Sequence, residues 1–244
     1  LLKEEQNRYI QKTWEEIGGI IRVNKIDLEL LKKYNKNVIS IANGYDHEKY
    51  ANFNYNKFEK NGGIEQSLID FIKDKKIIFT LGGLIKRKGV HDLLHAAKKL
   101  NYKRNDYVLL VGGSGPEKES LDFFIKDNKI DNCKLLGFLS DDEVLYWMQK
   151  CDLFTIPSYS EGNPTTMFEA LGSGKPVVST RVGGVPEILN DGCGILVDND
   201  PEDISIKINE ALNKNWKNSE IMKYSEKYTW ENIAKEIFVF YNLK

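Results

Sequence analysis

Short apolar runs alternate with helix-length amphipathic stretches from about residue 76 to residue 198, and this alternation limits the fold more than any other feature. Most of the runs are continuous, as in strands buried on both faces of a sheet; they fall at residues 77–81, 107–111, 134–136, 153–156, 177–180 and 195–197. Between the first two, Val90, Leu93, Leu94, Ala97 and Leu100 follow one helical stripe. The repeated strand–helix units predict an α/β fold, in which helices cover both faces of a parallel sheet.

The two ends of the chain do not continue this series. Residues 19–23 and 38–41 read as strands with a helix at 26–34 between them, and a turn signal follows at 42–46. The Asn-, Tyr- and Lys-rich residues 49–62 are interpreted as a connecting segment. Thr229 is the predicted N-cap of a C-terminal helix. We therefore divide the chain into the end of a preceding domain (1–43), an α/β domain (44–225) and a C-terminal helix that packs back toward the first part (226–244).

The charges and the scattered reactive residues exclude several classes of function. The chain has 35 Lys and Arg against 36 Asp and Glu, so it lacks the basic excess of a general nucleic-acid binder. No apolar stretch approaches the length of a membrane span. Cys133, Cys151 and Cys193 form no CxxC pair and are predicted to be small buried residues. His91 and His95 share a helix face without a metal-site motif, which predicts ordinary packing.

The residues richest in chemistry, 158–171, directly follow the predicted strand 153–156. They therefore lie at the carboxyl edge of the sheet, where ligands of open α/β sheets bind. Asn163 is the predicted N-cap of the next helix and Pro164 its first residue. The N–H groups of Thr165 and Thr166 would then lack helical partners and, with the helix dipole, would form an anion site.

Two carboxylates bracket this predicted anion site. Glu169 lies five residues beyond Pro164, about 7.5 Å along the helix axis, which suits a ribose bound beside a phosphate at the helix start. A carboxylate accepts hydrogen bonds from both vicinal hydroxyls of a ribose. Glu161 precedes the helix, on the side where a sugar attached to the phosphates would lie. The spacing therefore predicts a sugar-nucleotide site.

The segment from Glu161 to Glu169 resembles the E-x7-E motif of the GT-B glycosyltransferases, in particular the large retaining family often called family 4. Further segments are similar to motifs of that family and occur in its order: Asn43–Asp46, Leu81–Gly89, Gly112–Glu117, Leu136–Phe138, Gly172–Val178 and Gly183–Glu187. Together they cover about residues 40–198 and are highly specific. The resemblance implies a Rossmann-like C-terminal half of a GT-B fold, preceded by a remnant of the N-terminal domain.

The resemblance also assigns roles to individual residues. Glu169 would bind the ribose hydroxyls, Glu161 the hydroxyls of the donor sugar, and Lys88 the diphosphate as its charge develops. The implied catalytic residues are Lys88 and Glu161, and the implied donor-binding residues are Gly82, Gly83, Arg87, Lys88, Gly137, Phe138, Leu139, Glu161, Gly162, Asn163, Pro164, Thr165, Thr166 and Glu169.

Two of these positions leave alternatives open. Gly83 stands where the family has a diphosphate-binding Arg, so either Lys88 acts with backbone amides alone or Arg87 takes over part of that role. Phe138 lies where the resemblance places the base; it can stack on the base, but a core position is the favoured interpretation.

The resemblance implies a retaining hexosyltransferase that moves a sugar from a nucleoside-diphosphate sugar to a glycan or lipid acceptor, as in polysaccharide biosynthesis. No metal or other cofactor is expected, and Asp141–Asp142 is interpreted as a helix start rather than a metal site. The expected location is the cytoplasm or the cytoplasmic face of a membrane, with peripheral membrane association through an N-terminal domain. Because acceptor residues would lie on that domain, this chain alone is expected to be weakly active or inactive. A GT-B epimerase of UDP-N-acetylhexosamine and a non-catalytic sugar-nucleotide-binding subunit remain as alternatives.

Overall fold

The computed structural model describes residues 7–242, so residues 1–6 and 243–244 of the two outer predicted segments lie outside the described residues. Six strands form one parallel sheet in the order β5-β4-β3-β6-β7-β8. Their bounds are β3 Lys76–Leu81, β4 Tyr107–Gly112, β5 Cys133–Gly137, β6 Leu153–Ile156, β7 Val177–Thr180 and β8 Gly194–Val197. The predicted parallel α/β sheet is confirmed.

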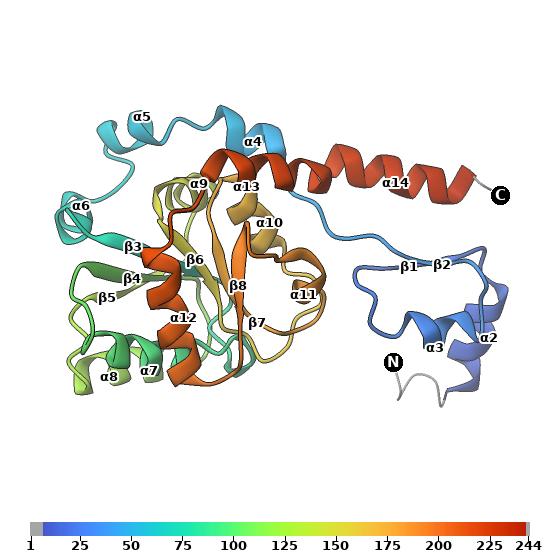
Figure 1. Cartoon of the computed structure of the whole chain (residues 1–244), viewed down its shortest axis with the longest axis horizontal. Coiled ribbons are helices and arrows are strands. Elements are labelled where there is room, and N and C mark those ends of the chain that lie inside the picture. The colour runs from blue at the N-terminus through green and yellow to red at the C-terminus, as the bar shows by residue number, and fades with distance from the viewer. Residues whose placement is uncertain (1–6, 243–244) are drawn as a thin grey trace.

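Helices cover both faces of this sheet (Figure 1). One face packs against α7 (Val90–Leu100), α8 (Lys118–Asp127) and α12 (Pro201–Asn213). The other packs against α9 (Asp141–Lys150), α10 (Thr165–Gly172) and α13 (Asn218–Ser225). Successive strand residues alternate between the two cores, as in β3, where Phe79 joins the second face and Ile78 the first. The continuous apolar runs of the sequence follow from this two-sided burial.

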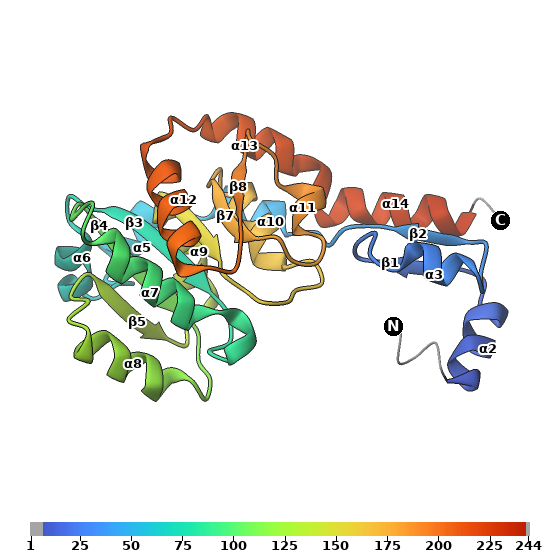
Figure 2. The same ribbon diagram turned by 60° about the horizontal axis from the view of Figure 1, so that its bottom comes forward.

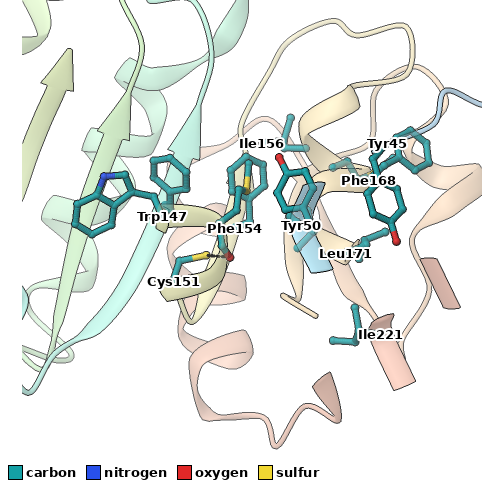
Figure 3. Close-up of a cluster of buried hydrophobic side chains, with 14 of the residues drawn as sticks. Tyr45, Tyr50, Trp147, Cys151, Phe154, Ile156, Phe168, Leu171 and Ile221 are labelled. Atoms are coloured by element: carbon teal, nitrogen blue, oxygen red, sulfur yellow. Dashed lines mark hydrogen bonds between the residues drawn. The ribbon is translucent and has the colours of Figure 1, made fainter. Parts of the chain in front are cut away.

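Several large aromatic side chains pack among aliphatic ones in the core on the α9–α10 face (Figure 3). Trp147, Phe154 and Phe168 are almost completely buried there. Each large apolar side chain buried in this way stabilises the fold by roughly 1.5–3 kcal/mol. Tyr50, which comes from outside the α/β series, enters the same cluster and is 6% exposed.

The residues before the sheet form a separate small unit. It consists of α2 (Arg8–Glu16), β1 (Ile20–Arg22), α3 (Leu28–Lys32) and β2 (Val38–Ser40), with β1 and β2 paired in parallel. Helix α14 (Trp230–Asn242) lies alongside this unit in Figures 1 and 2. Thr229 caps α14, since its hydroxyl accepts a hydrogen bond from the N–H of Asn232 at 3.3 Å. The division of the chain into three domains stays a prediction.

The connecting segment predicted at residues 49–62 is largely helical. It contains α4 (His47–Asn52) and α5 (Tyr55–Lys60), and α6 (Gln66–Ile72) follows. The side chain of Asp46 caps α4 and that of Asn54 caps α5. Asp46 and Asn54 are therefore helix caps. Asn and Asp are common both in turns and at helix N-caps, so their presence alone does not distinguish the two. A short 3-10 helix, η2 (Glu226–Tyr228), connects α13 to α14.

Candidate functional site

The chain reverses its path along the sheet between β3 and β6, and loops from several strands meet at that point. The connections β3–β4–β5 run toward one edge, after which the chain returns to place β6 beside β3. Such a switch point is the usual ligand site of an open parallel sheet. The loops after β3 and β6, together with the end of β4, line a pocket there, whose walls include Gly82, Gly83, Lys88, Ser158, Glu161 and Thr166.

An ion pair between Lys88 and Glu161 lies in this pocket. The Lys88 Nζ is 2.7 Å from Oε1 of Glu161, and the Ser158 hydroxyl donates to the same oxygen at 2.6 Å. Arg87 approaches the other carboxylate oxygen at 3.4 Å and donates to the Ser160 carbonyl at 2.5 Å. The Glu161 side chain is only 7% exposed. The two predicted catalytic residues are therefore in direct contact, and Arg87 joins them.

The surroundings of Glu161 keep its carboxyl group ionised. Burial raises its pKa, but the hydrogen bonds from Lys88 and Ser158, together with the charges of Lys88 and Arg87, outweigh burial. The net result is a pKa below the ordinary value for Glu. Glu161 is thus a poor proton donor near neutral pH and a good acceptor of hydrogen bonds from hydroxyl groups.

Gly89 allows Lys88 to reach Glu161. Lys88 ends the short 3-10 helix η1 (Lys86–Lys88), and Gly89 links it to α7 with φ of 65°. A Cβ atom at Gly89 would lie 1.9 Å from the carbonyl oxygen of Pro157. Only glycine combines this left-handed conformation with so close an approach. The loop after β3 therefore packs directly on the loop of residues 157–164, which we call the β6–α10 loop.

The start of α10 differs in detail from the prediction. The N-cap is Pro164, without a side-chain capping bond, so the predicted N-cap at Asn163 is wrong. The Asn163 side chain is buried and donates to the Val23 carbonyl at 2.6 Å instead. That bond turns the amide toward Val23, and Oδ1 of Asn163, the atom that would cap the helix, is buried without a partner among residues 7–242. Among residues 7–242, no acceptor receives the N–H groups of Thr165 or Thr166, as expected at a helix N-terminus.

Glu169 lies on α10, one turn beyond Thr165. The hydroxyl of Tyr50 favours the ionised form of its carboxyl group, and Lys49 and Asp141 contribute opposing charges. Burial is the largest influence and raises the pKa of Glu169 above its ordinary value, although Tyr50 and Lys49 oppose it. Lys49 itself pairs with Asp141 at 2.8 Å. A desolvated carboxylate beside an anion-binding helix start suits hydroxyl donors such as those of a ribose.

The residues predicted near the base lie at the end of β5, at the carboxyl edge of the sheet. Phe138 is 81% exposed, so the favoured core position was wrong. Its neighbour Leu139 is 8% exposed and packs toward Gly112 instead. Alternation along the extended chain after β5 turns one side chain inward and the other to solvent. Gly83 is also exposed, and a Cβ there would meet nothing closer than 3.9 Å, so a larger residue fits at this position.

Sequence reasoning missed several residues that contact the predicted site. Ser158 bonds to Glu161, Tyr50 influences the ionisation of Glu169, and Asn24 and Asn43 bond to the β6–α10 loop. For Ser158, the signal was its position three residues before Glu161. The other three lie more than 100 residues away from their partners in sequence, so no local pattern indicates them.

The residues with other possible chemistry pack as structural residues. The His95 ring packs edge-to-face against the Phe124 ring, with the ring centroids 4.5 Å apart. The three cysteines are buried and unbonded to one another. Within residues 7–242, no group of three or more His, Cys, Asp or Glu side chains has a metal-binding arrangement. Over the same residues, no helix is both long enough and apolar enough to cross a bilayer.

Comparisons with known proteins agree with this geometry. The family described as glycosyl transferases group 1 matches residues 65–228. An uncharacterized glycosyltransferase of Methanocaldococcus jannaschii is 32% identical over 179 residues, which make up 69% of this chain and 48% of that protein. A 2-deoxystreptamine N-acetyl-D-glucosaminyltransferase of Niallia circulans is 32% identical over 138 residues, or 56% of this chain and 35% of that protein. The chain thus spans about half the length, or less, of these curated relatives.

A solved structure of HepE from Anabaena in complex with UDP superposes with a TM-score of 0.80. The superposition covers 97% of this chain and 67% of that chain at 19% sequence identity, so it shows a shared fold, that of the GT-B glycosyltransferases. From the family match and the curated relatives, we conclude that the chain belongs to the glycosyl transferases group 1 family.

Proposed function

We propose that this chain forms the donor-binding part of a retaining glycosyltransferase of family 4, which transfers a hexosyl group from a nucleoside-diphosphate sugar to a glycan or lipid acceptor. The observation that carries the proposal is the Lys88–Glu161 ion pair in front of α10, with Glu169 one turn into that helix. This order matches the order of a donor molecule: sugar, diphosphate, ribose. The proposed location is the cytoplasm or the cytoplasmic face of a membrane.

In the proposed reaction, the bond between the anomeric carbon and the diphosphate oxygen breaks while a bond to the acceptor oxygen forms. The acceptor proton leaves with the diphosphate, on which negative charge develops. Lys88 and the unpartnered N–H groups of Thr165 and Thr166 would stabilise that charge. Arg87 already reaches Glu161, so it can supply a second cation where Gly83 replaces the usual Arg. No metal or other cofactor is part of this proposal.

The nucleoside would lie between Glu169 and the exposed ring of Phe138. An aromatic face at the mouth of the site can stack on a base, which contributes about 1–3 kcal/mol. UDP is the first nucleotide to test, because HepE of Anabaena, which shares the fold, has been solved with UDP. The names of the curated relatives favour transfer over the epimerase and the non-catalytic binding subunit.

A thermal-shift screen of this chain with UDP, GDP and ADP and their sugars tests the proposal. A ligand at 100 times its Kd stabilises a protein by about 2.7 kcal/mol, which corresponds to roughly 5–10 °C in Tm for a chain of this size. We expect one nucleotide class to produce such a shift and the Glu169→Ala variant to lose it. If no nucleotide raises Tm, the donor site is refuted. Retention is tested on the full-length protein, from the anomeric configuration of the product by NMR.

A further inference from the structure

The small N-terminal unit and the residues directly after it hold the β6–α10 loop by hydrogen bonds from amide side chains, of which that of Asn24 is buried. The carbonyl oxygen of Gly162 accepts two of them, one from Nδ2 of Asn24 at 2.8 Å and one from the N–H of Gly184 at 2.7 Å. Asn24 is 4% exposed and follows β1 by two residues, and Gly184, which precedes α11 (Val185–Ile188), lies directly beside it. Two segments that are far apart in sequence therefore fix one carbonyl group.

The next peptide is held in the same manner. Nδ2 of Asn43 donates to the Asn163 carbonyl at 2.6 Å, and the Asn163 side chain donates to the Val23 carbonyl at 2.6 Å. The N–H of Lys25 donates to the Glu187 carboxylate at 2.7 Å and ties the same unit to α11. Oδ1 of Asn24 accepts from the N–H of Ile26 at 3.1 Å, so both ends of this amide are committed and its orientation is determined.

This fixation determines where the remaining N–H group of the loop points. In a trans peptide, the C=O of one residue and the N–H of the next point in opposite directions. Because the Gly162 carbonyl is turned toward Asn24 and Gly184, the N–H of Asn163 must point away from both. No acceptor for that N–H exists among residues 7–242. It lies between Glu161 and the start of α10, where the proposed diphosphate and sugar meet.

We infer that Asn24 and Asn43 are positioning residues that act through the β6–α10 loop. Asn24 orients the Asn163 N–H toward the β-phosphate of the donor, and Asn43 holds the Asn163–Pro164 peptide, which sets where α10 begins and where its free N–H groups point. The inference rests on the proposed function. Neither side chain has to touch the donor, because each is already bonded to the loop backbone. The affinity of the loop for a second phosphate therefore depends on residues outside the α/β sheet that carries the site.

Nucleotides that differ by one phosphate test the inference. The variants are Asn24→Ala and Asn43→Ala, and the control is Asn37→Ala, whose amide also donates to a carbonyl, that of Gly18 at 3.2 Å, but is exposed. Ligand-observed NMR titrations measure Kd for UDP and for UMP. Since one net hydrogen bond changes Kd by about two- to tenfold, we expect that loss for UDP in each test variant. For UMP, and for both ligands with the control, we expect less than about a twofold change.

The possible results separate this inference from the proposed function. If the unaltered chain binds none of UDP, GDP and ADP, the proposed function is refuted, and so is the inference that rests on it. If the unaltered chain binds UDP and the test variants bind it equally well, only the positioning role is refuted. If UMP and UDP weaken by the same factor, the side chains merely support the fold, which also refutes the role. Should the screen favour GDP or ADP, the corresponding monophosphate replaces UMP.

Discussion

Replacing either partner of the Lys88–Glu161 pair is expected to change nucleotide binding in opposite directions. Without ligand, Lys88 Nζ lies 2.7 Å from a Glu161 oxygen, so a bound diphosphate must compete with that carboxylate for the same cation. Lys88→Met removes the cation and leaves the buried carboxylate with Ser158 and Arg87 as partners. Glu161→Gln removes the competing charge and keeps the cation, while an amide can still accept from Ser158.

The size of the effect follows from the hydrogen bonds at stake. A hydrogen bond to a charged group contributes about 1.5–3 kcal/mol, which corresponds to roughly 10- to 140-fold in Kd. We expect Lys88→Met to weaken UDP binding by that factor, and Glu161→Gln to leave it unchanged or strengthen it by up to about tenfold. Transfer by the full-length protein should fall in both variants, because each removes a group that contacts the donor.

Isothermal titration calorimetry with UDP measures both effects without an acceptor. Lys86→Met is the matched control, since Lys86 belongs to the same 3-10 helix, is exposed, and bonds to no side chain among residues 7–242. Its Kd should remain within about twofold of the unaltered chain. Equal weakening by Lys88→Met and Glu161→Gln would refute the competition argument, because the pair would then act only as a structural unit. Unchanged binding in Lys88→Met would remove Lys88 from the site.

Two further predictions concern the nucleoside end of the site. Phe138→Ala should leave Tm unchanged, because the ring is 81% exposed, but weaken UDP binding by about 1–3 kcal/mol in calorimetry; a large loss of Tm would mean that the ring supports the fold. Glu169 has a raised pKa, so its stabilising contribution is present at acidic pH and lost as the pH rises through that pKa. Glu169→Gln should therefore raise Tm at pH 7.5 and lose this gain below about pH 4, near the ordinary Glu pKa, while it weakens UDP binding. A lower Tm at pH 7.5 would contradict the burial argument.

Ionisation of Glu161 affects the stability of the fold with the opposite pH dependence to that of Glu169, so the two variants can be compared directly. Its pKa is lowered despite burial, so its ionised form stabilises the folded state above the ordinary Glu pKa. That contribution is lost as the pH falls through the lowered value. Glu161→Gln should accordingly lower Tm at pH 7.5 where Glu169→Gln raises it, and scanning calorimetry at both pH values measures the two differences together.

Residues with strong local signals were predicted well. Each of the six apolar runs became a strand of the parallel sheet, because burial on both faces leaves a continuous hydrophobic pattern in the sequence. Thr229 caps α14 as expected, since a cap bonds only to residues two or three positions away. Lys88 and Glu161 were chosen by resemblance to a family, and the structure brings them into contact across 73 residues of chain.

Predictions failed where a distant partner overrode a local preference. Asn163 has the sequence signature of an N-cap, but the Val23 carbonyl, 140 residues away, takes its side-chain N–H. Residues 49–62 were interpreted only as a connecting segment, and neither the short helices that they form nor the burial of Tyr50 in the core beside α10 was predicted. The sequence around Phe138 does not indicate how exposed its ring is. An aromatic residue after a strand packs into the core or faces solvent according to which segments cover the end of the strand.

The sequence alone determined the strand–helix order, the placement of the two glutamates at a strand end, and the family resemblance, because all three depend on short-range spacing. Only the tertiary structure decided which groups meet: the Lys88–Glu161 pair, the burial of Tyr50 near Glu169, and the amides of Asn24 and Asn43 on the β6–α10 loop. The physical reason is that a hydrogen bond or an ion pair acts over about 3 Å of space, whatever the number of residues between its partners.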